Sequence, residues 1–359
     1  MRDLESPTAA PPTRTSPPPG PSLIARWDLD KTYLRTDFDT LRDLLLTAIE
    51  RPDQKKTVPG AAELLRQLGK IGVETHILSG SPEQLRGRLE EKLRLDGVRY
   101  ASLTLKPNLE NLLRLRFRAL RGQLGYKLPS LLLRRCELAS QRAPSGGLVR
   151  EILLGDDAEA DAFVYSLFAD VCAGEVDSDT LAYVLTEGGA YPDSVADAVR
   201  FANYIEKGPV VDRVLIHLDR QSSPSEFAEY GPRVVPFYNY LQAAFILQDG
   251  GWLSAEAVLS VASDLVIVHN FEPRSLARSW VDLARRGHVT SDILPGLRAA
   301  FSQRMERRSS GAESELSAML EELERTPAIE LPARSPTKID YVKLVRDHNP
   351  RHKKKKKRR

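Results

Sequence analysis

The sequence is poor in cysteine, and this bears on the class of protein it encodes. It contains only two cysteines, Cys136 and Cys172, both in apolar surroundings. Two such thiols do not form a disulfide framework, so we interpret them as core residues of a protein in a reducing compartment. A basic segment followed by an apolar one is missing near the N-terminus, so no secretory signal is expected. No apolar run is long enough to cross a bilayer. These absences predict a cytoplasmic protein without a transmembrane segment.

An excess of charge of one sign is also missing from most of the chain. The net charge is +3, yet all seven residues of 353–359 are Lys or Arg. The rest of the chain is therefore net acidic by four charges, and attraction to an anionic partner must come from this polybasic tail. Three interpretations of the tail are open: a solvated end, a peripheral contact with an anionic membrane, and a contact with nucleic acid.

Length and composition indicate a folded protein of one large domain, or two smaller ones, with tails. The chain has 359 residues, of which 42% are hydrophobic and 28% charged, which is typical of globular proteins. Residues 1–22 are rich in Pro, Ser and Thr and are expected to be disordered. We place a domain boundary near residue 176, between an α/β domain over 23–175 and an all-helical domain over 176–308. Residues 309–359 are expected to form a flexible tail.

The pattern over residues 23–175 predicts a parallel sheet with helices on both faces, because strand-like and helical segments alternate. The expected strands cover residues 23–28, 73–78, 100–105, 151–154 and 170–172, the last at an edge. The expected helices of this domain cover residues 38–50, 59–68, 82–95, 108–124, 128–136 and 158–168. In the C-terminal domain helices are expected at 180–185, 194–206, 211–218, 232–247, 254–265, 274–286 and 291–308, with a short element at 340–346.

Polar residues follow three of the expected strands at their carboxyl ends. Asp28 and Asp30 follow the first strand, Ser79 follows the second, and Asp156 follows the strand at 151–154. Lys127 lies between Ser79 and Asp156 in the sequence. Ligands of open parallel sheets bind beyond this edge, so we expect these side chains to lie close together.

This set of residue types matches what phosphoryl transfer from a monoester requires. One carboxylate can attack phosphorus and form an aspartyl-phosphate, and a second can protonate the leaving oxygen and then activate water. A hard cation such as Mg²⁺ must screen the carboxylates from the phosphate. A hydroxyl and an ammonium can hold the remaining phosphate oxygens. Asp28, Asp30, Asp156, Ser79 and Lys127 supply these groups.

The motifs around these residues resemble those of the haloacid dehalogenase (HAD) superfamily of phosphatases, above all its lipin-like and actin-patch-associated phosphatidate phosphatase branch. The resemblance covers residues 23–175, less than half of the chain. It includes Lys127 and three motifs: DxDxTxxxT (Asp28, Asp30, Thr32, Thr36), SxSP (Ser79, Ser81, Pro82) and GDxxExDxxxY (Gly155, Asp156, Glu159, Asp161, Tyr165). The chain departs from this branch at Lys31, where Asp or Gly is usual, and at Asp157, where Ser is common.

The resemblance implies a Mg²⁺-dependent phosphomonoester hydrolase that works through an aspartyl-phosphate. Asp28 would then be the nucleophile and Asp30 the general acid and base. Phosphate would be bound by Ser79, Gly80, Lys127 and Thr32. The metal ligands would be Asp28, the carbonyl of Asp30, and Asp156. Asp157 and Asp161 would have secondary roles.

The substrate stays open at this stage. The resemblance favours phosphatidate or another lipid phosphate, while the alternatives are a nucleic-acid end phosphatase and a non-catalytic module that binds a phosphorylated ligand. Residues 37–72 and 83–126 are too compact for a large cap, so an open site is expected unless residues 177–308 close over it. Within residues 177–308, His217, Asp219 and Arg220 are candidates for a site, but we interpret them as structural residues.

Overall fold

The core of the protein is a six-stranded, all-parallel sheet with the strand order β3-β2-β1-β4-β5-β6. We analysed a computed structural model, which describes residues 21–35, 56–106, 123–307, 313–325 and 338–348. The strands are β1 (Leu23–Asp28), β2 (Glu74–Pro82), β3 (Ser102–Lys106), β4 (Arg150–Asp156), β5 (Val211–His217) and β6 (Val234–Phe237). The predicted parallel α/β sheet is therefore confirmed.

Two of the six strands lie where only helices were expected. The prediction of a helix over 211–218 is wrong, since this segment forms β5, and the expected helix over 232–247 is split into β6 and the helix α10 (Tyr240–Asp249). The sheet continues across residue 176, so the chain beyond it is not a separate all-helical unit. A parallel strand covered on both faces is apolar without alternation, and so resembles a buried helix in sequence.

The segment 170–172 is also not an edge strand. It belongs to helix α7 (Asp161–Ala173), in which every residue from Asp161 to Cys172 is buried. The helix expected over 158–168 corresponds to the first part of α7, and because α7 is covered on all sides, no polar face in the sequence showed that the helix continues to residue 173.

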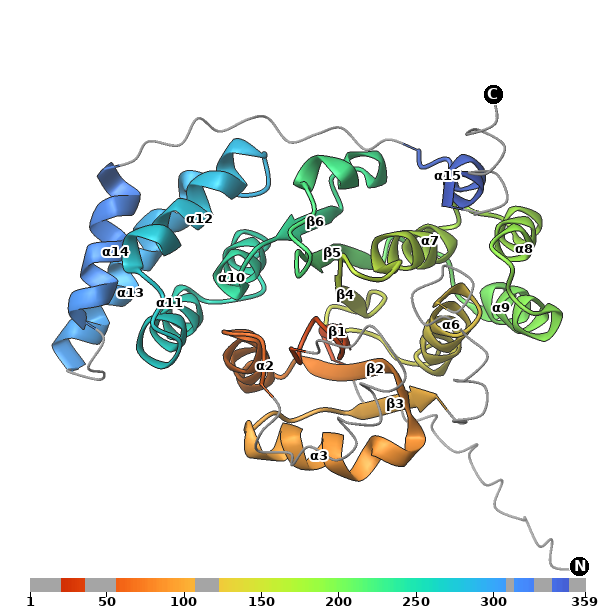
Figure 1. Ribbon diagram of the computed structural model, residues 1–359, viewed down its shortest axis with the longest axis horizontal. Helices are drawn as coiled ribbons and strands as arrows, with labels where there is room; N and C mark the ends of the chain where they lie inside the picture. The colour runs from red at the N-terminus through yellow and green to blue at the C-terminus, as the bar shows by residue number, and fades with distance from the viewer. Residues whose placement is uncertain (1–20, 36–55, 107–122, 308–312, 326–337, 349–359) are drawn as a thin grey trace, which may run out of the picture.

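Helices cover both faces of the sheet (Figure 1). Helices α2 (Ala61–Lys70), α3 (Arg86–Leu95) and α10 pack on one face, while α6 (Lys127–Glu137) and α7 pack on the other. Beyond α6 and α7 lie α8 (Ser178–Glu187), α9 (Pro192–Tyr204) and α15 (Tyr341–His348). Beyond α2 and α10 lie α11 (Ala255–Ser263), α12 (Pro273–Arg285), α13 (Leu294–Arg307) and α14 (Glu313–Arg325). Short helical turns cover Glu83–Leu85, Pro224–Tyr230, Asp264–Val268 and Ser291–Ile293.

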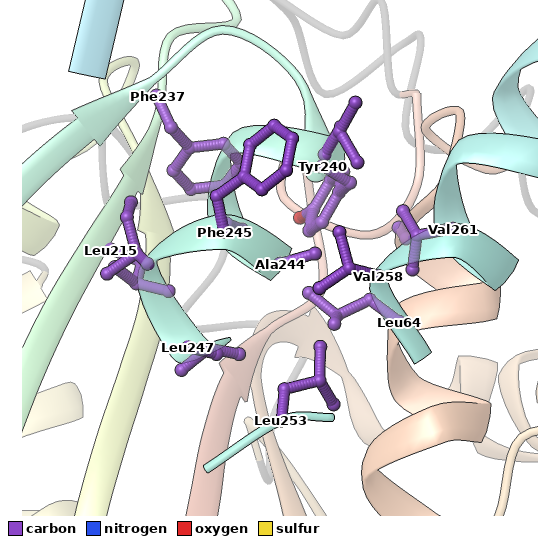
Figure 2. Packing of buried hydrophobic residues seen from close by; sticks show 14 of the residues in the cluster. Leu64, Leu215, Phe237, Tyr240, Ala244, Phe245, Leu247, Leu253, Val258 and Val261 are labelled. Atoms are coloured by element: carbon purple, nitrogen blue, oxygen red, sulfur yellow. The ribbon is translucent and has the colours of Figure 1, made fainter. Parts of the chain in front are cut away.

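Helix α10 lies at the centre of the larger hydrophobic cluster (Figure 2). It begins after Asn239, whose side chain accepts a hydrogen bond from the backbone of Gln242 as an N-cap. Residues Tyr240 to Leu247 are all buried, because the sheet lies on one side of the helix and α2 and α11 on the other. The C-terminal half of the chain therefore shares one core with the N-terminal half.

Several expected elements fall outside the described residues. These are the helix over 38–50, nearly all of the helix over 108–124, most of the Pro-rich start and the polybasic tail. The expectation of a flexible tail over 309–359 is wrong for α14, which buries Leu316, Met319, Leu320 and Leu323. The short element expected near residue 340 is confirmed as α15. Within the described part of the chain, no helix is long and apolar enough to span a membrane.

Candidate functional site

The site predicted from the sequence lies where the strand order of the sheet reverses. Strands β1 and β4 are neighbours at the centre, and each ends in an aspartate, Asp28 and Asp156. Trp27 pairs with Leu154, so the two aspartates leave adjacent strands within one residue step of each other. Such a reversal opens a crevice at the carboxyl edge of a parallel sheet, which is where ligands bind.

Lys127 is the centre of a buried cluster of charges at this edge. It is the first residue of α6, and its Nζ lies 2.8 Å from Asp28 Oδ1, 2.8 Å from Glu159 Oε2 and 2.5 Å from Asp161 Oδ1. Burial alone would lower the pKa of Lys127, but Asp161, Asp28 and Glu159 outweigh burial and raise this pKa well above its usual value. Lys127 is therefore a permanent cation that joins the end of β1 to the loop after β4.

Asp30 is held by two hydroxyl groups from β2. Its Oδ2 accepts hydrogen bonds of 3.0 Å from both Ser79 Oγ and Ser81 Oγ. The hydroxyl of Ser79 also accepts a hydrogen bond of 2.9 Å from the backbone N–H of Ser81. These contacts fix the Asp30 carboxylate against the end of β2. They also mean that the Ser79 hydroxyl must turn away from Asp30 before it can donate to a phosphate oxygen.

The turn after β1 is supported by residues from the C-terminal half of the chain. Lys31 has a φ of 62°, a left-handed conformation that Gly, Asn and Asp adopt at lower cost than Lys. Its carbonyl contacts His217 Nδ1 at 3.0 Å, and the carbonyl of Thr32 accepts a hydrogen bond from the hydroxyl of Tyr240. The Thr32 hydroxyl lies 3.5 Å from Asp28 Oδ2. The turn is thus held from outside in a strained conformation.

His217 is the last residue of β5, and the interpretation of it as part of a helix is wrong. It pairs in register with Asp156 on β4. Burial lowers the pKa of His217, so the ring is neutral and serves as a fixed hydrogen-bonding partner of the turn.

Of the two carboxylate oxygens of Asp156, one accepts hydrogen bonds and the other has no hydrogen-bond donor among the described residues. Its Oδ1 accepts hydrogen bonds from the backbone N–H groups of Ala158 at 2.6 Å and Glu159 at 3.0 Å. Its Oδ2 is buried and has no hydrogen-bond partner among the described residues. Burial, followed by the charges of Asp161 and Glu159, raises the pKa of Asp156 well above its usual value. A buried carboxylate oxygen without a donor is suited to a cation.

Asp157 has a different role from its neighbour. Its two oxygens accept hydrogen bonds from the backbone N–H groups of Arg220 at 2.8 Å and Ser222 at 3.1 Å. Asp157 therefore fixes the loop after β5 to the end of β4. The backbone of Arg220 takes part in this contact, and Asp219 lies 3.7 Å from the ammonium of Lys31.

A group of three acids could hold a metal ion. Carboxylate oxygens of Asp28, Glu159 and Asp161 lie within 4.8 Å of one another. In the structure the Lys127 ammonium already contacts all three of these carboxylates. An ion bound by these three acids would have to share them with the Lys127 ammonium, whereas the buried Oδ2 of Asp156 has no hydrogen-bond partner among the described residues. The acids present are of the kind that holds a divalent cation.

Comparison with known proteins does not identify the family. No protein-family model matches the chain, and no curated protein matches it either. Among solved structures, a chain of a Pnkp1/Rnl/Hen1 complex shares 18% identity over 41% of this chain and 44% of that chain, with a TM-score of 0.27. A similarity of this size says nothing about the site.

Lys106 is a cation at the same edge of the sheet that the sequence analysis missed. It ends β3, is buried, and has its Nζ 5.2 Å from the ring centroid of Tyr126. A Cβ placed on Gly80 would lie 3.9 Å from this ammonium. Burial lowers the pKa of Lys106, and the charges of Glu159, Asp30 and Asp28 act against burial. The signal that pointed to Ser79, a polar residue at a strand end, was also present at Lys106.

The structure thus brings the predicted residues together through a chain of contacts. Asp28 is joined to Lys127, and Lys127 to Asp161, whose Oδ2 accepts a hydrogen bond of 3.2 Å from the backbone N–H of Asp156. Asp30 is joined to Ser79, and Gly80 lies beside Lys106. Buried acids outnumber the two lysines, so the site is short of positive charge.

Proposed function

We propose that the protein is a Mg²⁺-dependent phosphomonoester hydrolase. The observation that carries this proposal is the pair of buried carboxylates at the reversal of the strand order, Asp28 beside Lys127 and Asp156 with an unpaired oxygen. A structural ion pair alone would not need the second carboxylate. A site for an anionic phosphate does need it, because a cation must be held there.

In the first step, a carboxylate oxygen of Asp28 attacks phosphorus, and the bond between phosphorus and the leaving oxygen breaks. Asp30, protonated for this step, gives its proton to the leaving oxygen and becomes a carboxylate. In the second step, water attacks the phosphorus of the aspartyl-phosphate and loses a proton to Asp30, and the bond between phosphorus and the Asp28 oxygen breaks. Phosphate leaves, and both aspartates return to their starting states. Ser79 and Ser81 hold Asp30 in place for both proton transfers.

The two lysines have separate tasks in this proposal. Lys127 is committed to three carboxylates and fixes the position of Asp28. Lys106, beside Gly80, contributes the second ammonium, which attracts the phosphate oxygens. A bound Mg²⁺, held by Asp28, Asp156 and the carbonyl of Asp30, would neutralise charge on the phosphate and make attack by a carboxylate possible.

The test is release of inorganic phosphate from a generic aryl phosphate, with and without Mg²⁺. We expect activity with Mg²⁺, loss of activity with a chelator, and a fall of about a thousandfold or more in the Asp28→Asn variant. Asp197→Asn is the matched control, because Asp197 lies on the exposed face of α9 and pairs only with Arg200 among the described residues. Activity that survives Asp28→Asn would exclude this mechanism.

A non-catalytic module that binds phosphate would give a different result. Such a protein would bind inorganic phosphate in the presence of Mg²⁺ without releasing phosphate from any ester. Equilibrium binding measured beside the activity assay separates the two functions.

A further inference from the structure

A pocket adjoins the candidate site at the carboxyl ends of β5 and β6. Its volume is about 340 Å³, and its lining includes Arg35, Val58, His217, Tyr238 and Phe271. These residues come from separate segments: the turn after β1, the loop before α2, the ends of β5 and β6, and the segment before α12. Small-molecule sites of parallel sheets form where such segments converge beyond the strand ends, and the volume lies within their usual range of about 300–1,000 Å³.

Three contacts fix this pocket to the proposed catalytic residues. His217, which lines it, contacts the carbonyl of Lys31 at 3.0 Å. Asp219, also in its lining, lies 3.7 Å from the Lys31 ammonium. The loop that continues from Asp219 is held by Asp157, which directly follows Asp156. A ligand in this pocket would therefore lie in a fixed position relative to Asp28.

The lining of the pocket combines aromatic and aliphatic side chains with polar ones, among them Arg35, Asp219, Gln221 and Asn239. Tyr238 is 45% exposed, although Phe237 before it is fully buried; β6 ends at Phe237, and Tyr238 lies in the segment beyond the strand. Phe271, Val58 and Leu218 add apolar surface, and Arg35 and Gln221 add hydrogen-bonding groups. An exposed tyrosine beside such walls offers a flat surface on which an aromatic ring can stack.

We propose that this pocket binds the base of a nucleoside whose phosphate lies at Asp28. The inference rests on the proposed phosphatase function and names the class of its substrate. Strand β4 lies between β1 and β5, so the ends of β1 and β5, which carry Asp28 and His217, are about 10 Å apart at the spacing of neighbouring strands. In a simple aryl phosphate the ring is attached to the ester oxygen and stays too close to phosphorus. In a nucleotide, a sugar separates phosphate from ring and can span the gap.

The polar residues that line the pocket argue for a base over a lipid chain. A saturated chain forms no hydrogen bonds and would leave Gln221 and Arg35 without new partners. The edge of a nucleobase carries donors and acceptors that such side chains can bind, while its faces stack on tyrosine.

The first test is equilibrium binding of adenosine 5′-monophosphate, which does not depend on turnover. It compares Asp28→Asn with the double variant Asp28→Asn and Tyr238→Ala. We expect the second substitution to weaken binding about tenfold, the usual effect of removing one stacked aromatic ring. Tyr238→Phe should retain the affinity, and Tyr204→Ala, which removes a tyrosine that is 72% exposed on α9, is the matched control. Equal affinity with and without the Tyr238 ring would overturn the proposal.

The second test is selectivity. In the otherwise unmodified protein, Tyr238→Ala should lower the ratio of kcat/KM for adenosine 5′-monophosphate to that for glycerol 2-phosphate about tenfold, while Tyr204→Ala should not change this ratio. A 5′-phosphorylated oligonucleotide then distinguishes a polynucleotide end from a free nucleotide as the source of the base. If the protein hydrolysed phosphatidate in vesicles in preference to both the nucleotide and the oligonucleotide, the pocket would not be a nucleoside site, but the proposed hydrolase function would stand. Absence of hydrolysis of every ester would refute the hydrolase, and the binding experiment would still decide the pocket.

Discussion

At the scale of single residues, the two lysines of the site are both buried but have different surroundings. Lys127 contacts three carboxylates, so its removal would leave those charges buried without a partner, which costs about 3–5 kcal/mol. Lys106 packs against the ring of Tyr126 and lies beside Gly80. A loss of activity in a Lys127 variant would therefore combine an effect on folding with an effect on catalysis. A Lys106 variant tests phosphate binding more directly.

Replacing Lys106 with Met should weaken the binding of inorganic phosphate while the protein stays folded. Met fills a similar volume and retains contact with the Tyr126 ring, but it removes the ammonium that we propose attracts the phosphate oxygens. We expect the Kd for phosphate, measured calorimetrically with Mg²⁺ present, to rise about tenfold. Lys70→Met at the exposed end of α2 is the control. An unchanged Kd for phosphate would show that Lys106 has only a structural role.

At the scale of strands and helices, the sequence was most informative where an apolar run ended in a polar residue to which chemistry could assign a role. Strands β1, β2 and β4 were predicted together with Asp28, Ser79 and Asp156 because each apolar run stops at such a residue. Strand β5 also ends this way, at His217, but Asp212 and Arg213 interrupt it, and the short apolar run Val214–Ile216 that remains fits a buried helix as well. Periodicity could not distinguish the two, since both faces of the strand are covered.

Contacts that depend on long-range packing could not be predicted at all. The hydroxyl of Tyr240 reaches the carbonyl of Thr32 only because α10 packs on the face of the sheet that carries Trp27, whose ring stacks on Tyr240 with centroids 5.8 Å apart. The same holds for the pocket, whose lining comes from segments that are distant in the sequence. The sequence predicted the chemical groups at the strand ends but not the residues that hold them in place.

The pairing of β2 with β3 contains a histidine that should make this edge of the sheet sensitive to acid. His76 on β2 pairs in register with Ser102 on β3, and its Nδ1 lies 2.8 Å from the Ser102 hydroxyl. Burial, followed by the charge of Arg26, lowers the pKa of His76 to about 4. In the unfolded chain this pKa is about 6.5, so below that pH the unfolded state binds more protons than the folded state. Stability should therefore fall as the pH is lowered from about 6.5 towards 4.

Urea unfolding at pH 7 and pH 4.5 measures this effect. The loss of unfolding free energy between the two pH values should be smaller by about 2 kcal/mol in His76→Asn than in the wild type. Comparing the two losses cancels the contribution of carboxyl groups that titrate in both proteins. Equal losses in the two proteins would show that protonation of His76 does not oppose folding.

At the scale of the whole molecule, both halves of the chain build one sheet and one site. Strands β5 and β6 extend the sheet beyond β4, and α10 covers the face that carries Trp27 and Leu154 (Figure 1). His217 and Tyr240 hold the turn that contains Asp30 and Thr32. The segment that carries the predicted motifs, residues 23–175, is therefore not expected to form the site alone.

Ending the chain at residue 176 should give a fragment without a native fold. The fragment would leave β4 as an exposed edge and uncover the apolar face that α10 normally buries, both of which favour collapse and aggregation. We expect loss of cooperative urea unfolding, binding of the dye ANS, and a weak near-ultraviolet circular dichroism signal. The matched control is a chain that ends at residue 348 and so retains α15 and every described strand and helix. If the 176-residue fragment unfolded cooperatively and released phosphate from an aryl ester, β5, β6 and α10 would not be needed for the site. The six-stranded sheet would then consist of two parts that fold independently and pack together.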